Sequence, residues 1–380
     1  MYSWDIISSD SWPIYISLQK DGILFKMRRT QDLPDKESAT MFFQDCKLAH
    51  QAQITGISHS VKEILPPDLL DLTQLQKEAN IRYGYTASEV YDIAQSLYEK
   101  KLISYPRTSS RYLTEDVFDS LSPIMARLLS WELFPAAKGT GGIDISNLSR
   151  HVINAEKNNV HHAIIITGIR PGNLSEKEMQ VYRLVAGRML ETFMAPCRIE
   201  TTNVEAVCAA QHFKAEQTRI IEAGWHDVFM RSDMVPKSGY SVNELPEVEK
   251  SDTLNVCGCN MVHKKQMPVN PFTDAELVEY MEQNGLGTVS SRTNIIRTLV
   301  NRKYIRYSGK YIVPTPKGMF TYETIRGKKI ADTSLTADWE KQLAGLESGM
   351  ITGQDFLNRI RTLAKEMTDD IFNTYSTKEE

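Results

Sequence analysis

Residues 86–113, which read TASEVYDIAQSLYEKKLISYPRTSSRYL, form the stretch around which the rest of the chain is organised. Thr86 and Glu89 have the spacing of a capping box, and apolar residues then recur at helical spacing through Leu97. The next apolar pair breaks that period, and Pro106 favours an extended conformation for the residue before it. The pattern predicts a helix followed by a short strand that presents Tyr105 and Arg107 on the same side of the chain.

A tyrosine beside an arginine suits attack on a phosphodiester. A neutral phenol is a weak nucleophile, and a neighbouring cation or base activates it. The guanidinium of Arg107 would supply the cation and would hold the phosphate in its planar fork. The alternative is a Tyr-Pro turn beside a solvated arginine, and the local residues alone leave both interpretations open.

The composition is that of an ordinary globular protein. A chain of 380 residues with 41% hydrophobic and 24% charged residues has room for two or three domains. The net charge of -4 requires any contact with nucleic acid to come from a local groove. No apolar run approaches the roughly 20 residues of a membrane span, so we expect no contact with a membrane.

A cytoplasmic location is expected by default, and the cysteines agree with it. They are five in number and scattered, which suits a reducing compartment.

Cys257 and Cys259 lie near His263, but they lack the Cys-x-x-Cys spacing of a zinc site and no second pair follows. We therefore expect no metal bound by this chain.

The chain predicts a multidomain α+β fold. Two prolines at 66 and 67 mark a boundary, and alternating patterns on either side of a long helical block indicate strands. We expect a β-rich domain made of residues 1–62 and 195–265, a helical domain at 63–194 that carries Tyr105, and a second helical domain at 266–380. Within them we expect a hairpin turn at Asp21-Gly22, a helix over 114–131, and a helix capped by Thr336.

An internal echo links the two helical domains. Residues 97–105 read LYEKKLISY and residues 299–307 read LVNRKYIRY, so Leu, Lys, Ile and Tyr match in the same register. Helix, short link and strand is the sequence form of a helix-turn-helix or winged-helix unit, and residues 310–313 would form the wing of the second copy. Two such units favour nucleic-acid binding, although amphipathic helices that end in Lys-x-Ile also match by coincidence.

His161 and His162 are the second chemical candidate, because they enter the apolar run at 163–166. One interpretation is a histidine held near a phosphate or a titrating oxygen, and another is a partly buried strand end. A phosphotransferase that uses one of these histidines is a third interpretation.

Several of these segments, in this order, resemble the motifs of a known family. Residues 105–113, YPRTSSRYL, resemble the active-site tyrosine segment of type IA DNA topoisomerases, closest to the bacterial topoisomerase III branch. Residues 75–80, LQKEAN, and 161–165, HHAII, also look like segments of that family. Residues 286–292, LGTVSSR, resemble its Gly-Thr-Pro-x-Thr-Arg motif, and residues 336–340, TADWE, fit its C-terminal region.

The resemblance implies a fold and a set of roles. It implies winged-helix, CAP-like helical domains joined by a β-rich arch domain. Tyr105 would break one DNA strand and keep its 5′ phosphate, Arg107 would position that phosphate, and His161 would contact the scissile region. The implied DNA contacts, mainly with single-stranded DNA, are Thr108, Arg111, His162, Thr288, Ser290, Ser291 and Arg292.

The sequence departs from the family pattern in three ways. Ser109 replaces an acidic residue, and Ile166 and Val289 each replace a usual proline. The family's Toprim domain, whose acidic residues bind Mg²⁺, has no counterpart in these residues. We therefore expect a fragment that is inactive alone, monomeric and associated with the nucleoid, with Mg²⁺ bound only in the parent enzyme. A non-enzymatic winged-helix DNA-binding protein is the alternative.

Overall fold

The computed structural model describes residues 11–33, 35–131, 133–134, 143–154, 161–229, 238–264 and 271–376. The chain divides into two compact units. The first comprises Met1–Pro67, Phe134–Asp144 and Leu190–Asn270, and the second comprises Asp68–Leu133, Ile145–Met189 and Pro271–Glu380. Both predicted helical domains thus fall in the second unit, and the predicted boundary at residue 265 lies outside the described residues.

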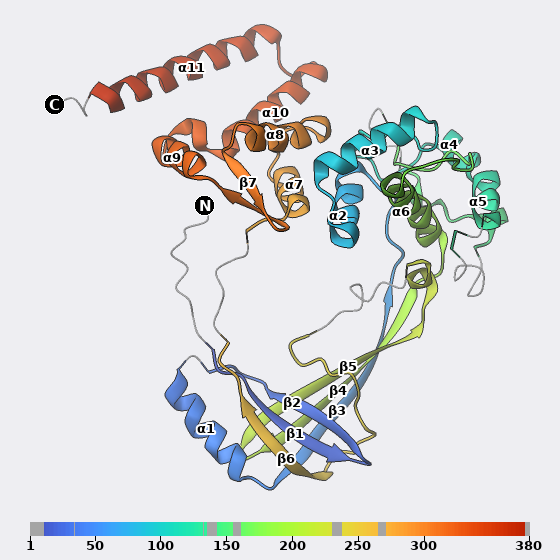
Figure 1. Ribbon diagram of the computed structural model, residues 1–380, viewed down its shortest axis with the longest axis vertical. Coiled ribbons are helices and arrows are strands. Elements are labelled where there is room, and N and C mark those ends of the chain that lie inside the picture. The colour runs from blue at the N-terminus through green and yellow to red at the C-terminus, as the bar shows by residue number, and fades with distance from the viewer. Residues whose placement is uncertain are drawn as a thin grey trace. The chain divides into compact units, whose positions relative to one another are not determined.

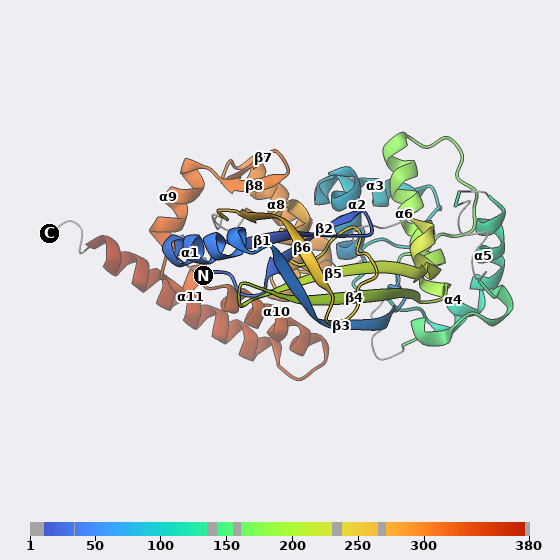
Figure 2. The ribbon, with the colours of Figure 1, turned by 90° about the horizontal axis from the view of Figure 1, so that it is seen from below.

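The first unit is built on one antiparallel sheet that closes on itself. Its strands pair in the order β1-β2-β5-β4-β3-β6, and β6 pairs back with β1. Figure 2 shows β3, β4 and β5 running side by side. The elements are β1 (Ile14–Lys20), β2 (Ile23–Arg29), α1 (Lys36–Leu48), β3 (Gln51–Ile64), β4 (Cys197–Cys208), β5 (Gln211–Glu222), η4 (Gly224–Val228) and β6 (Thr253–Met261).

Buried and more exposed residues alternate along the strands, and the buried residues form the core of the first unit. Ile14, Ile16 and Leu18 of β1 are buried, and they pack with Phe25 and Met27 of β2. Asp21 and Gly22 both have positive φ, as the predicted turn between these strands requires. Helix α1 lies against β6 and β1. The hairpin expected from the sequence is therefore confirmed.

The second unit is mainly helical (Figure 1). Its first segment holds α2 (Leu72–Tyr83), α3 (Ala87–Glu99), α4 (Glu115–Asp119), α5 (Leu121–Ser130), η2 (Ile145–Asn147), η3 (Arg150–Val152) and α6 (Glu176–Phe193), whose last residues belong to the first unit. Its second segment holds α7 (Asp274–Gln283), α8 (Val289–Asn301), β7 (Ile305–Ser308), β8 (Tyr311–Pro314), α9 (Pro316–Ile325), η6 (Lys329–Ala331), α10 (Thr333–Glu347) and α11 (Gly353–Ser376).

Two helix predictions were wrong in detail. The helix expected over 114–131 is two helices, α4 and α5, that meet at Ser120. Pro123 lacks an N–H and its ring clashes with the carbonyl four residues earlier, which accounts for the break. Helix α10 begins at Thr333 rather than after Thr336, because the carboxylate of Asp332 accepts a hydrogen bond from the Ser334 N–H at 2.9 Å and caps the helix one turn earlier.

Candidate active site

Helix α3 carries the chain to Tyr105. Its capping box is formed as the sequence predicts, since the Thr86 hydroxyl and the Glu89 carboxylate each accept from the other's backbone N–H. The helix ends at Glu99 and is capped by Lys100, and the next residue, Lys101, has a φ of 59°. The N–H of Leu102 donates to the Leu97 carbonyl at 3.0 Å, a bond that closes the last turn and redirects the chain.

The short strand predicted before Tyr105 is not formed. Ile103 makes a single antiparallel bridge with Ile166. The Ser104 N–H donates to the Ile165 carbonyl at 2.8 Å, and the Thr167 N–H donates to the Leu102 carbonyl at 3.1 Å. Pro106 has no N–H with which to extend this pairing. The apolar run after the two histidines thus fixes the start of the tyrosine segment from one side.

Tyr105 is half-buried and lies between two aromatic rings. Its ring centroid is 4.4 Å from that of His161 and 5.4 Å from that of Tyr98, which meets it edge to face. The Thr108 hydroxyl donates to the backbone carbonyl of His161 at 3.0 Å. That bond ties the residues after Tyr105 to the histidine segment, so the phenol and the imidazole are held beside each other.

Arg107 is held by helix α3 without an acidic partner. Its guanidinium lies 4.9 Å from the ring centroid of Tyr91, and its Nη2 donates to Gln95 Oε1 at 3.2 Å. Among the described residues, no carboxylate lies within ion-pair distance of Arg107. Its positive charge is therefore available to an anion that enters the site.

The first turn of α8 faces the tyrosine segment across a cavity of about 370 Å³. The Thr288 N–H donates to the Ser291 hydroxyl at 2.8 Å, which caps the helix. The next N–H groups have no acceptor within their own helix, and a helix N-terminus favours negative charge. The cavity is lined by Tyr105, Arg107, Thr108, Ser109, His161, Thr288, Val289 and Ser290. A phenol, a guanidinium, an imidazole and a helix N-terminus thus meet at one place, and the guanidinium and the helix N-terminus are suited to bind a phosphate.

Four other predicted site residues do not line this cavity. Arg111 donates from Nε to the buried Asp71 carboxylate at 2.6 Å, and His162 Nδ1 lies 2.7 Å from the Ala163 carbonyl oxygen. Ser291 lines a neighbouring cavity. Arg292 is 8% exposed, and its Nη1 lies 3.2 Å from the Glu282 carboxylate. In this structure the two arginines fix α2 and α8, and their contacts with DNA stay predictions.

Sequence reasoning missed Tyr91, Gln95 and Tyr98. These residues of α3 hold Arg107 and flank Tyr105. The signal was present, because they recur at intervals of four and three and so share one helix face next to the buried stripe.

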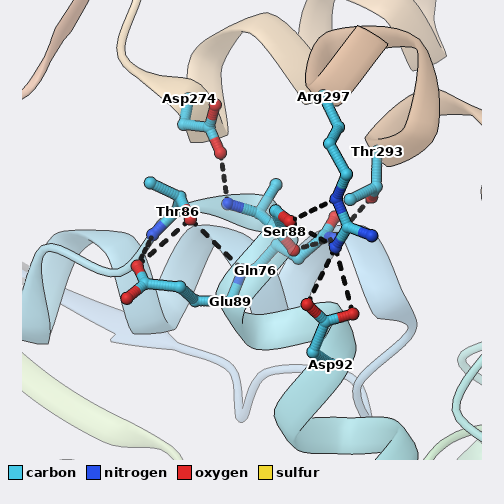
Figure 3. A network of polar contacts seen from close by, with 9 residues as sticks. Gln76, Thr86, Ser88, Glu89, Asp92, Asp274, Thr293 and Arg297 are labelled. Atoms are coloured by element: carbon cyan, nitrogen blue, oxygen red, sulfur yellow. Dashed lines mark hydrogen bonds and ion pairs between the residues drawn. The ribbon is translucent and has the colours of Figure 1, made fainter. Parts of the chain in front are cut away.

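Helix α3 is held against α7 and α8 by a polar network (Figure 3). Asp274, which is 1% exposed, accepts from the Ala87 N–H at the start of α3, and burial raises the pKa of its carboxyl. Arg297 donates to both carboxylate oxygens of Asp92, at 2.8 and 3.0 Å, and also to Ser88. These contacts position the two helices whose ends form the cavity.

The internal echo has a structural counterpart. Lys303 has a φ of 61°, close to the 59° of Lys101, and the Tyr304 N–H donates to the Leu299 carbonyl at 2.9 Å. Helix α8 then leads into the β7–β8 hairpin, where residues 310–313 were expected to form a wing. In addition, α2 contacts α7 and α3 contacts α8. Both copies therefore end their second helix with the same left-handed lysine.

The cavity that contains Tyr105 is lined without acidic side chains. Mg²⁺ binds through carboxylate oxygens and water, and the cavity lining contains no carboxylate. Within the described part of the chain, no group of three or more His, Cys, Asp or Glu side chains is arranged to hold a metal ion.

None of the described helices is long and apolar enough to span a membrane.

Comparison with known proteins identifies the family. A family model described as DNA topoisomerase matches residues 5–358. The chain belongs to the type IA DNA topoisomerase family. The family that the sequence motifs predicted is thereby confirmed.

The chain is similar to several proteins named as DNA topoisomerases. It is 31% identical over 344 residues to DNA topoisomerase 3 of Bacillus licheniformis, covering 84% of the chain and 47% of the relative. It is 30% identical to DNA topoisomerase 3 of Bacillus subtilis, covering 86% and 48%, and 30% identical to DNA topoisomerase 1 of Methanocaldococcus jannaschii, covering 96% and 46%. The chain thus spans about half the length of these curated relatives.

A solved structure supports the fold. Full-length topoisomerase I from Thermotoga maritima superposes with a TM-score of 0.72 at 22% identity, covering 96% of this chain and 60% of that one. The chain therefore has the type IA topoisomerase fold with mixed α and β content, which confirms the predicted fold class but not its winged-helix and arch domains.

Proposed function

We propose that this chain is the strand-cleaving part of a DNA topoisomerase III. In this proposal Tyr105 transiently breaks one DNA strand and keeps its 5′ phosphate, so that another strand passes before the ends are rejoined. The outcome is relaxation of negative supercoils or decatenation. The observation that carries the proposal is the cavity in which Tyr105, Arg107, His161 and the N-terminus of α8 meet.

The chemistry assigns a role to each group in the cavity. The Tyr105 oxygen forms a bond to phosphorus, and the bond from phosphorus to the 3′ oxygen of the neighbouring nucleotide breaks. The phenol loses its proton, and the departing 3′ oxygen gains one. Arg107 and the amides at the start of α8 stabilise the negative charge that builds up on the phosphate. His161 lies beside the Tyr105 ring, where it contacts the scissile region and orients the phenol.

Two further groups have to reach this cavity. An acid must protonate the leaving oxygen, and a metal ion would order the phosphate, yet the lining offers no carboxylate for either purpose. We propose that a Toprim domain supplies both, with Mg²⁺ bound there, and that the 380-residue chain alone does not complete the reaction. Magnesium-dependent relaxation of negatively supercoiled DNA by this chain alone would contradict that part of the proposal.

The rest of the fold suits binding of a single strand. We propose that the closed sheet of the first unit is the arch domain, and that α7, α8 and the β7–β8 hairpin form a winged helix. The strand backbone would lie along Thr108, Thr288 and Ser290, with Ser291, Arg292, Arg111 and His162 as further contacts. Base contacts would rest on stacking and groove shape, as is usual for single-strand binding. We infer a monomer in the cytoplasm, associated with the nucleoid.

A covalent trapping experiment tests the function. Labelled single-stranded DNA is mixed with the chain and a Toprim domain, denatured, and separated by electrophoresis. We expect a protein–DNA adduct that Tyr105→Phe abolishes, because only the phenol oxygen forms the bond. An adduct that survives Tyr105→Phe, or no adduct in any condition, would contradict the proposal.

The β7–β8 hairpin directly after α8 favours one alternative, a non-enzymatic winged-helix DNA-binding protein. That protein would bind DNA equally well with Tyr105→Phe and would form no adduct. The same gel, read together with a binding assay, separates the two.

A further inference from the structure

A second cavity continues the tyrosine site between α3 and α8. It has a volume of about 530 Å³, and it shares Arg107 and Ser290 with the cavity that contains Tyr105. Because the two cavities share these residues, they form one continuous surface that passes the guanidinium. A strand whose phosphate lies at Tyr105 would therefore have a neighbouring nucleotide within reach of the second cavity.

The lining of this second cavity differs from a phosphate site. Its side chains are Tyr91 from α3 and Ser291, Asn294, Ile295, Thr298 and Leu299 from α8, besides the shared Arg107 and Ser290. Arg107 is its single charged residue. An aromatic ring, aliphatic side chains and an amide match the flat face and the polar edge of a nucleobase better than a run of phosphates.

The polar groups of this cavity are available to a ligand. The side-chain amide of Asn294 makes no hydrogen bond with any residue that the structure describes, and Asn294 is exposed. Ile295 next to it is 39% exposed, so its side chain is open to a ligand in the cavity. The Thr298 hydroxyl donates to the Asn294 carbonyl at 2.7 Å, so its lone pairs stay free to accept.

Tyr91 and Arg107 form a preformed stacking surface. The guanidinium lies 4.9 Å from the Tyr91 ring centroid, and Gln95 holds the guanidinium through its Oε1. A planar cation against an aromatic ring presents flat faces on which a base stacks with little loss of side-chain freedom.

We propose that the groove between α3 and α8 is a nucleobase subsite. It takes the base of a nucleotide that flanks the phosphate held at Tyr105. The base stacks on Tyr91, with Ile295 against it, and its polar edge meets the Asn294 amide. This subsite rests on the proposed function, because it adds a base contact to the same single strand.

The test measures binding of a fluorescent 12-nucleotide single strand to the 380-residue chain at low salt. We expect Tyr91→Ala to weaken binding about 10-fold, as loss of one stacked base does, and Tyr91→Phe to retain most of the affinity. Tyr322→Ala, which removes a tyrosine exposed to 46% on α9, is the matched control and should bind normally. Thermal melting of each variant checks that it is folded.

An abasic scan locates the subsite on the strand. Each nucleotide in turn is replaced by an abasic site, and each strand is measured with the unmutated chain and with Tyr91→Ala. One position should lose affinity in the unmutated chain and show no further loss in Tyr91→Ala. Asn294→Ala should reduce the difference in affinity between oligo-dT, oligo-dC and oligo-dA, because the amide contacts the base edge.

The outcomes separate the two proposals. Binding that is unchanged in a folded Tyr91→Ala chain, or an abasic scan without such a position, would overturn the subsite and leave the proposed function standing. Absence of strand binding by the unmutated chain would overturn the subsite, whereas the proposed function is decided by the adduct formed together with a Toprim domain. A Tyr91→Phe chain that is folded and as weak as Tyr91→Ala would also overturn the subsite, since stacking does not need the hydroxyl.

Discussion

At the scale of single residues, the site depends on which charges are already neutralised. Arg107 has no carboxylate partner among the described residues, whereas Arg111 and Arg292 each lie against one. The sequence places all three arginines in motifs that are expected to bind DNA, and it does not show which of them has an acidic partner. The distance from an arginine to such a partner is set by the tertiary fold. Asp71 precedes Arg111 by 40 residues, a separation that no local pattern reveals.

Arg107 should make one phosphate contact. We expect Arg107→Ala to weaken single-strand binding and to reduce the slope of log affinity against log salt by about 0.7, because one fewer counterion is released. Fluorescence anisotropy over a range of salt concentrations measures that slope. Arg359→Ala, at an exposed position of α11, is the control and should leave the slope unchanged. An unaltered slope in Arg107→Ala would show that Arg107 does not contact the phosphate.

Arg111 should matter first for stability. Arg111→Ala leaves the Asp71 carboxylate, whose side chain is 2% exposed, without its cation. We expect a loss of about 2 kcal/mol in the free energy of unfolding, less than for a fully buried pair because Arg111 is itself 36% exposed. Arg150→Ala breaks an exposed pair with Glu115 and should cost at most about 0.5 kcal/mol in a urea titration. Equal losses would contradict a structural role for Arg111.

At the scale of elements, α6 is joined to the end of α3 just before the tyrosine segment. Glu178 accepts from Lys100 and from Ser96, at 2.5 and 2.7 Å, and caps its own helix through Ser175. The hydrogen bonds from Lys100, Ser96 and Ser175 lower the pKa of Glu178 to about 2. The carboxylate therefore contributes to stability only while it is ionised.

That contribution should disappear in acid. The folded pKa lies below the ordinary value of 4.5 for a glutamate, so the stabilisation is present above pH 4.5 and is lost as the pH falls toward about 2. Glu178→Gln should be about 1 kcal/mol less stable than the unmutated chain at pH 6 and nearly equal to it near pH 2. Urea titrations at several pH values measure the difference. A difference that is constant with pH would contradict the linkage.

Helix starts and turns were predictable where the sequence signal lies within a few neighbouring residues. The capping boxes at Thr86, Ser175 and Thr273 and the left-handed turn at Asp21-Gly22 each depend on residues within one turn. The segment before Tyr105 was not predictable, because its backbone hydrogen bonds go to residues 165–167 and the apolar pair that suggested a strand forms one bridge. The cavity forms only because α8 lies opposite α3. The similarity between residues 97–105 and 299–307 did not predict that pairing.

At the scale of the whole molecule, each of the two compact units has its own core. In the first unit, Trp225 is buried, and its indole donates to the Ile64 carbonyl at 2.9 Å. Gly224 before it has a φ of +53°, and a Cβ there would overlap the backbone oxygens of Ala195 and Pro196. Gly22 has a φ of +82° with open space around it.

Alanine substitutions at the two glycines distinguish the cost of a positive φ from the cost of a steric clash between Cβ and the backbone. We expect Gly22→Ala to cost about 1 kcal/mol, from positive φ alone, and Gly224→Ala to cost about 3 kcal/mol or more. Calorimetry should show the loss in the transition of the first unit, with single-strand binding at Tyr105 unchanged in the folded protein. A Gly224→Ala chain no less stable than Gly22→Ala would contradict the predicted collision.

The polar network that joins α2 and α3 to α8 links parts of the chain that are synthesised at different times. Gln76 donates to Thr293, a partner 217 residues later in the chain. On a ribosome, the tyrosine segment leaves the exit tunnel long before α8 has been translated. Contacts between such distant residues form slowly, because a long loop has to close first. Tyr105 is thus synthesised well before α8, so a nascent chain holds the tyrosine for a time without the cavity that both of them line.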